Sequence, residues 1–151
     1  MARFVSTKTF GAERGFAVAY RQWKADTHCN LIHGYSLGFH MEFSCDERDL
    51  DARNWVVDFG GLKGLKAMLE DTFDHKLLVA KDDPEIEWFR EAHKRGIADI
   101  VEVEAGGCEK FAELVYLCSE QWLKDAGFSP RCRLVSVEVS EHGANSAIYQ
   151  G

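Results

Sequence analysis

The stretch from residue 35 to residue 45 reads YSLGFHMEFSC and alternates between two kinds of side chain. The large apolar side chains share one parity, namely Tyr35, Leu37, Phe39, Met41 and Phe43. Because successive side chains of a strand point to opposite faces, this pattern predicts a half-buried β-strand. Residues 132–141 repeat the pattern and predict a second strand, with one face formed by Val135, Val137, Val139 and Glu141.

Helical spacing and weaker strand patterns surround these two strands. Apolar residues recur at three- and four-residue steps over 61–73 and over 109–126, where they form a stripe of Phe111, Leu114, Val115, Cys118 and Trp122. A shorter helix is predicted from Asp83-Pro84 to just before Gly96, and weaker strands over 3–9, 16–20, 54–58 and 99–104. A sheet with one buried face, covered there by helices, is an α+β fold.

The length and composition indicate one soluble domain spanning residues 1–151. The chain has a net charge of -7 and 46% hydrophobic residues, which argues against disorder and against a basic nucleic-acid-binding face. No apolar run approaches the ~20 residues of a membrane span, and the first residues show no signal peptide. The five cysteines are odd in number and lack a CxxC spacing, so we expect reduced thiols in a cytoplasmic protein.

The segment around Cys29 is the first candidate for chemistry. Cys29 lies four residues before His33 in a polar stretch, with His28 beside it. A cysteine acts as a nucleophile or base through its thiolate, which an electropositive neighbour favours. The alternative reading, a small buried thiol near ordinary loop histidines, stays open because free cysteine is commonly buried.

Three carboxylates and one imidazole form the second set of candidates. Asp74 precedes His75, and a carboxylate can orient an imidazole and raise its basicity if a turn brings the two together. Glu141 continues the apolar parity of its strand, so its carboxylate needs partners, and two adjacent N–H donors of a ligand would suit it. A strand-end glutamate reaching solvent is the alternative. Glu109 opens the last helix, where an acidic residue favours the helix dipole.

Six segments in order resemble the family of 6-pyruvoyltetrahydropterin synthase and 6-carboxytetrahydropterin synthase, across nearly the whole chain. Residues 16–21 resemble the family pattern F-x-A-A-H-R, and residues 29–35 resemble C-x-x-x-H-G-H. The others are 57–63 (V-x-D-F-x-x-L-K), 74–78 (D-H-x-x-L), 108–112 (T-x-E-N-x-A), and 139–141 with 147–151 (E-T…Y-x-G).

The resemblance implies a tunnelling fold, in which each subunit gives a four-stranded antiparallel sheet with two main helices on one face. Subunits would join into an oligomeric barrel, a trimer-based ring or a hexamer, with active sites between subunits. The resemblance assigns proton transfer to Cys29, Asp74 and His75. It assigns binding of the pterin ring to Glu141, with Glu109 nearby.

The family's zinc site uses three histidines, and this sequence departs from it. The three positions hold Tyr20, His33 and Tyr35, so His33 is the only histidine left as a metal ligand. A phenol ionises near pH ~10, so one imidazole with two phenols is a poor zinc site. His28 remains a possible substitute ligand, whereas His40 has the wrong strand parity. Zinc is therefore an uncertain cofactor, and Tyr20 and Tyr35 are expected to donate hydrogen bonds to the substrate instead.

The leading functional hypothesis is a lyase of the 6-carboxytetrahydropterin synthase type. Its substrate would be 7,8-dihydroneopterin triphosphate or a related dihydropterin, and the place in 7-deazapurine (queuosine) or tetrahydrobiopterin synthesis stays open. The alternative is a zinc-free paralogue that binds a pterin or purine without turning it over. A purely structural oligomer would leave the joint presence of Cys29, Asp74, His75 and Glu141 to coincidence.

Overall fold

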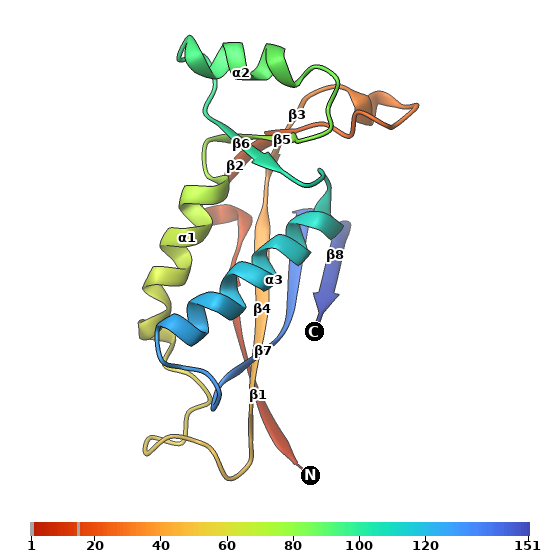
Figure 1. Cartoon of the computed structure of the whole chain (residues 1–151). Coiled ribbons are helices and arrows are strands. Elements are labelled where there is room, and N and C mark those ends of the chain that lie inside the picture. The colour runs from red at the N-terminus through yellow and green to blue at the C-terminus, as the bar shows by residue number, and fades with distance from the viewer. Residues whose placement is uncertain (1, 15) are drawn as a thin grey trace.

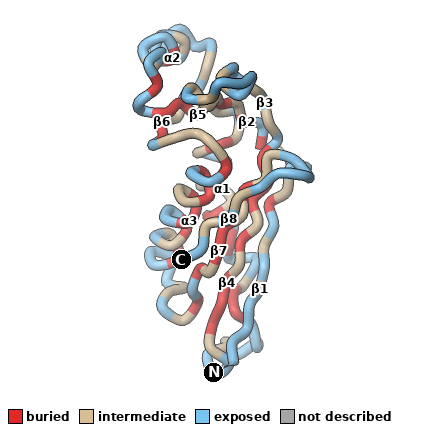
Figure 2. Tube along the Cα trace, turned by 90° about the vertical axis from the view of Figure 1, so that its right-hand side faces the viewer, coloured by how far each residue is buried: buried red, intermediate tan, exposed pale blue. Residues whose placement is uncertain are grey.

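The main sheet has four antiparallel strands, as the family resemblance implies. The computed structural model describes residues 2–14 and 16–151. The sheet has the order β1-β4-β7-β8 and is made of β1 (Arg3–Phe10), β4 (Gly38–Asp46), β7 (Arg133–His142) and β8 (Asn145–Gln150). Helices α1 (Lys63–Phe73) and α3 (Cys108–Asp125) cover one face of it (Figures 1 and 2). The predicted α+β architecture is confirmed.

The core lies between this sheet and the two helices. Phe39, Met41 and Phe43 of β4 are fully buried and meet the apolar stripes of the helices. The stripe of α1 is formed by Leu65, Leu69 and Phe73, with Phe73 against Phe39 and Phe111. Burial of each such side chain contributes about 1.5–3 kcal/mol, so the alternation over 39–45 accounts for the side of the sheet on which the helices lie. Figure 2 shows the buried residues along this seam.

A second, smaller sheet sits at one end of the molecule and was not predicted. Its order is β3-β2-β5-β6, from β2 (Ala17–Tyr20), β3 (His33–Ser36), β5 (Lys76–Ala80) and β6 (Ile100–Val103). Strand β5 pairs with both β2 and β6 in parallel. Its last four residues, Leu77 to Ala80, form a short apolar run, which sequence periodicity alone does not separate from a helix end. Helix α2 (Ile86–Lys94) connects β5 to β6.

The predicted strand over 35–45 is divided between the two sheets. Strand β3 ends at Ser36 and β4 begins at Gly38, while the Leu37 N–H donates to the Phe16 carbonyl at 3.1 Å. The alternation continues through the change of sheet, which is why the sequence shows one uninterrupted pattern. The break places Tyr35 in the small sheet and Phe39 in the main core.

The predicted strand over 54–58 is wrong. The Asp51 carboxylate accepts the N–H groups of Arg53 and Trp55 at 2.8 and 3.0 Å, and Asn54 takes a left-handed φ of 64°. Aspartate hydrogen bonds of this kind hold the backbone in a turn and compete with strand pairing. A 3₁₀ turn, Phe59–Leu62, then leads into α1 and is capped by Asp58.

Two predicted side-chain positions also need correction. Pairing between β4 and β7 shifts after Glu42, so Val135 is the extra residue of a bulge and Leu134 takes the buried place. Val137, Val139 and Glu141 keep the predicted face. On α3, Cys118 is exposed, because the buried stripe of the helix continues through Tyr116 and Ser119 instead. None of the helices in the described part of the chain has the length and apolar character needed to span a bilayer.

Candidate functional site

Three aromatic rings and one carboxylate meet where the small sheet approaches the start of α3. The Tyr20 ring stacks on Tyr35 with centroids 4.7 Å apart and meets the edge of Phe111 at 4.8 Å. The Tyr20 hydroxyl donates to Oε2 of Glu141 at 3.1 Å, and Asn145 Nδ2 donates to Oε1 at 3.2 Å. The Glu141 carboxylate is therefore oriented on both oxygens, on the side of the sheet that its parity predicts.

The electrostatics of this cluster keep its phenols and its thiol protonated. Burial, followed by the charges of Cys108 and Glu141, raises the pKa of Tyr20. Burial and the Glu141 charge likewise raise the pKa of Tyr35, and they raise the pKa of Cys108 to about 11. All three groups can thus donate a proton in hydrogen bonds near neutral pH, and none of them supplies an anion.

Cys29 lies next to this cluster, on the 3₁₀ turn His28–Asn30 between β2 and β3. The turn is capped by Thr27, and Cys29 is exposed. The charge of Cys29 is among the causes of the raised pKa of Tyr35, so the thiol and the phenol lie within electrostatic range of each other. The reading of Cys29 as a buried packing thiol is therefore wrong.

Asp74 and His75 form the predicted pair through a turn. His75 adopts a left-handed φ of 59° directly after α1, a conformation common just beyond helix ends. Its Nδ1–H donates to Asp74 Oδ1 at 2.9 Å, and the same oxygen accepts the Ala17 N–H at 3.2 Å. The imidazole itself is 81% exposed, so it is free to meet a ligand or another chain.

The structure does not bring Cys29 together with Asp74 and His75 in one chain. The His75 N–H donates to the Ala17 carbonyl at the start of β2, whereas the Cys29 carbonyl accepts from Gln22, beyond the end of β2. Strand β2 alone spans about 10 Å at roughly 3.3 Å per residue. Within one chain, the backbone at His75 and the backbone at Cys29 therefore lie near opposite ends of this strand.

His33 is the histidine at the family's metal positions, and the donor set around it does not fit zinc. Its Nδ1–H donates to the Leu31 carbonyl at 2.6 Å, which leaves Nε2 as a possible ligand atom. Tyr20 and Tyr35 stack on each other, and the raised pKa of each phenol disfavours the phenolate that a metal requires. Across residues 2–14 and 16–151, no group of three His, Cys, Asp or Glu is arranged to hold a metal ion.

His28 and Glu109 take peripheral positions. The His28 ring on the Cys29 turn lies 5.8 Å from the ring of His33 at the start of β3, centroid to centroid. Glu109 is exposed in the first turn of α3, and its charge contributes to the raised pKa of Cys108. Glu109 is thus near the cluster without being part of its hydrogen-bonded centre.

Sequence reasoning missed three members of the site. Cys108 and Phe111 stand on the first turn of α3, where the helical stripe explains their burial but not their contact with Tyr20. Asn145 starts β8 and reaches Glu141 across the β7–β8 turn. Only the closing β7–β8 hairpin brings Asn145 back to Glu141, so no local pattern identifies it.

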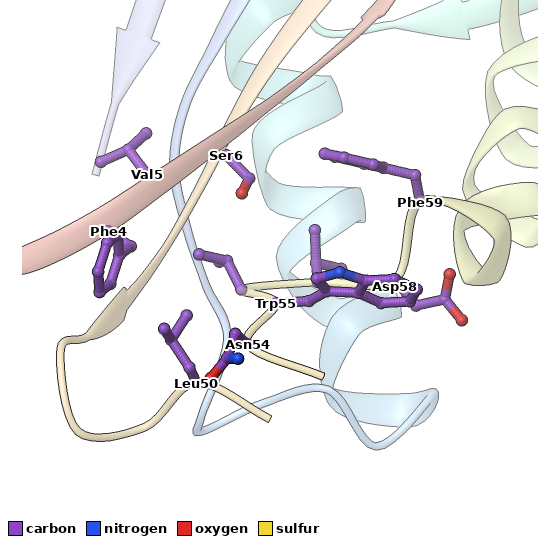
Figure 3. Close-up of a pocket in the computed structure, with 10 residues that line it drawn as sticks. Phe4, Val5, Ser6, Leu50, Asn54, Trp55, Asp58 and Phe59 are labelled. Carbon is purple, nitrogen blue, oxygen red and sulfur yellow. The ribbon is translucent and has the colours of Figure 1, made fainter. Parts of the chain in front are cut away.

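A separate apolar pocket of about 400 Å³ lies at the far end of the molecule from the Cys29 turn. Figure 3 shows Phe4 and Val5 of β1 beside Leu50 and Trp55 of the loop that follows β4. Its one carboxylate, Asp58, already accepts from Gly60 and Arg53. This pocket offers apolar contact and little chemistry, so the cluster around Glu141 is the candidate site.

Comparison with known proteins identifies relatives with one shared name. A 6-carboxy-5,6,7,8-tetrahydropterin synthase of Aquifex aeolicus is 26% identical over 95% of this chain and 96% of its own length. The enzymes of the same name from Rickettsia conorii and Rickettsia bellii are 29% and 33% identical over 47% and 43% of this chain. Those two matches span about half the length of each relative, 51% and 46%.

Solved structures share the fold. An uncharacterised protein of Wolinella succinogenes superposes with a TM-score of 0.81 at 17% identity, over 100% of this chain and 99% of its own. The 6-pyruvoyl tetrahydropterin synthase of Caenorhabditis elegans superposes with a TM-score of 0.66 at 18% identity, over 100% and 97%. The family described as 6-pyruvoyl tetrahydropterin synthase matches residues 10–151. The chain therefore belongs to the 6-pyruvoyl tetrahydropterin synthase family and has its tunnelling fold.

Proposed function

We propose that this protein binds a dihydropterin at the Glu141 cluster and acts on it as a lyase of the 6-carboxytetrahydropterin synthase type. The observation that carries the proposal is the Glu141 carboxylate, held by Tyr20 and Asn145 beside the stacked rings of Tyr20 and Tyr35. A carboxylate next to aromatic faces suits a flat heterocycle whose edge presents two N–H donors. Proton transfer on the substrate side chain is assigned to Cys29, whose thiol is exposed.

The test of this proposal is incubation with 7,8-dihydroneopterin triphosphate and with unphosphorylated dihydroneopterin, followed by identification of the products. A 6-carboxy product accompanied by acetaldehyde supports the proposed type of lyase, and a 6-pyruvoyl product identifies the other reaction of the family. The alternative function is a zinc-free paralogue that binds a pterin or purine without turnover, and the replacement of two metal-site histidines by Tyr20 and Tyr35 favours it. That alternative predicts tight binding and no product.

We propose further that the working form is a homo-oligomer in which one copy supplies Cys29 and another supplies His75. Both outer strands of the main sheet, β1 and β8, have one side without a partner strand in the part of the chain that the structure describes. Phe4 and Val5 are exposed on β1 beside the pocket of Figure 3, and Ile148 is 59% exposed on β8. Strand edges of this kind pair readily with another chain, and pairing β8 with β1 of the next copy would build a ring.

The shared site predicts complementation between two inactive variants. Cys29→Ala and His75→Ala are each expected to lose turnover, because each removes one member of the proton-transfer pair. Refolded together at equal amounts, they are expected to regain roughly one quarter of the wild-type activity, since random mixing gives both intact residues to about a quarter of all sites. Product formation per chain is the measurement. Mixtures no more active than the separate variants would contradict a site shared between copies.

We propose that this site works without a zinc ion of the family type. Dialysis against EDTA is expected to leave dihydropterin affinity and turnover within about twofold of the untreated protein, because two of the three donors are protonated phenols. The measurement is elemental analysis together with binding and product assays before and after dialysis. A Tyr20→His/Tyr35→His double variant, which presents three imidazoles with His33, is the control and is expected to retain more zinc. Stoichiometric zinc in the wild type, with turnover lost in EDTA, would contradict the proposal.

A further inference from the structure

The loop that carries Cys29 is closed by hydrogen bonds on both sides of this residue. The Gln22 N–H donates to the Cys29 carbonyl at 2.9 Å, and the Cys29 N–H donates to Thr27 Oγ1 at 3.4 Å. These bonds fix the path of the backbone at Cys29. They do not by themselves fix the loop relative to the rest of the protein, because all of their partners belong to the loop.

Asn30, the next residue, ties the loop together from its inside. Its Nδ2 donates to the carbonyls of Trp23 and Ala25 at 2.7 and 3.3 Å. The Arg21 Nη1 donates to both the backbone carbonyl and the Oδ1 of Asn30, each at 3.3 Å. Arg21 therefore holds the residue adjacent to Cys29 by two bonds.

Arg21 is in turn held by a carboxylate from another part of the chain. Asp83, in the loop between β5 and α2, accepts Arg21 Nε at 2.9 Å and Arg21 Nη2 at 2.7 Å. Asp83 is only 3% exposed, and one of its oxygens also accepts the Glu85 N–H at 2.9 Å. The Arg21 guanidinium lowers the pKa of the Asp83 carboxyl, so this buried pair stays ionised. A two-pronged arginine–carboxylate pair fixes direction as well as distance.

We infer that Arg21 and Asp83 are positioning residues for Cys29: the buried pair anchors the Cys29 turn to the β5–α2 loop through Asn30. This inference rests on the proposed function only for the role of Cys29 in proton transfer. Proton transfer requires hydrogen-bond reach between the thiol and the reacting group, and a displacement of about 1 Å costs on the order of 10²-fold in rate. Because a buried ion pair cannot release one partner without leaving the other unpaired, it holds the turn more firmly than a surface bond would.

The chain supplies a matched control in the residue next to Asp83. Asp82 also links the same two loops, accepting from Trp23 Nε1 at 3.1 Å and pairing with Lys24 at 3.3 Å. Both side chains of that ion pair are more than half exposed, at 63% for Lys24 and 55% for Asp82. Exposed pairs contribute little, so Asp82→Asn should leave the Cys29 turn in place while Asp83→Asn should not.

The first arm of the experiment is hydrogen exchange on the full-length protein, which needs no substrate. In Asp83→Asn and in Asn30→Ala, the backbone amides of residues 22–31 are expected to exchange at least roughly tenfold faster, since local opening controls their exchange. Asp82→Asn is expected to match the wild type, as are the amides of β4 in every variant. Asn30→Ala breaks the side-chain link to Arg21 without removing a charge, so it tests the same inference if Asp83→Asn folds poorly. Equal exchange in Asp83→Asn and Asp82→Asn would overturn the inference.

The second arm is steady-state kinetics with the dihydropterin that the wild type converts. Asp83→Asn is expected to lower kcat by about 10- to 100-fold while KM changes by less than about threefold, because the Glu141 cluster lies outside the network. Arg21→Lys is expected to lower kcat to a similar extent, since the lysine ammonium keeps the charge but cannot make the two parallel hydrogen bonds of the guanidinium. Faster exchange with an unchanged kcat would overturn the positioning role. If the wild type converts no dihydropterin, the proposed function fails, and the exchange arm alone supports or overturns the anchoring of the turn.

Discussion

Replacement of Cys29 by alanine is expected to lower kcat for the dihydropterin by about 10³-fold, within the range that one acid–base group contributes. Cys29 is exposed, whereas the two phenols and the Cys108 thiol of the Glu141 cluster all have raised pKa values, so none of them replaces it as a base. Affinity for the dihydropterin is expected to stay within about threefold, because the ring is held elsewhere.

The measurement for Cys29→Ala is single-turnover product formation together with direct binding. Cys118→Ala is the matched control, since Cys118 is also an exposed thiol but stands on α3 without a role in the cluster. A Cys29→Ala protein with wild-type kcat would remove Cys29 from the reaction. If the wild type itself forms no product, the binding alternative is favoured, and Cys29→Ala should then bind as the wild type does.

Replacement of Glu141 by glutamine is expected to weaken dihydropterin binding by about 10²-fold, since a hydrogen bond to a charged group contributes about 1.5–3 kcal/mol and a mismatched one costs more. The carboxylate accepts from Tyr20 and Asn145 and still has lone pairs for two ligand N–H groups. In the glutamine variant, the side-chain NH2 group replaces one carboxylate oxygen, so an N–H donor of the protein would face an N–H donor of the ligand. Both the lyase and the non-catalytic alternative predict this loss.

The measurement for Glu141→Gln is a binding titration by calorimetry or by pterin fluorescence. Glu138→Gln is the matched control, because Glu138 lies on the same strand and its carboxylate accepts from the Ser146 hydroxyl, at 2.6 Å, and not from Tyr20. Urea unfolding of both variants shows whether the loss reflects the site or the fold. Unchanged affinity in Glu141→Gln would place the pterin ring elsewhere, even if turnover were present.

The sequence predicted the main sheet well because its signals are local. Alternation over 35–45 and 132–141 decides which face of each strand is buried, and the stripes of α1 and α3 decide which helix face meets it. The same local logic failed at Val135 and over 54–58. At Val135 a bulge changes the parity, and over 54–58 the Asp51 carboxylate stabilises a turn within an apolar-looking segment.

The sequence by itself determined the α+β class, the buried faces and the residue types available for chemistry, because these follow from side-chain periodicity and identity. Only the tertiary structure decided which of those residues meet. The parallel pairing of β2 with β5 separates Cys29 from His75, and the approach of α3 to β2 brings Tyr20, Cys108 and Glu141 together. The contact between Tyr20 and Glu141 joins segments 121 residues apart in the sequence, so it depends on the packing of the whole chain.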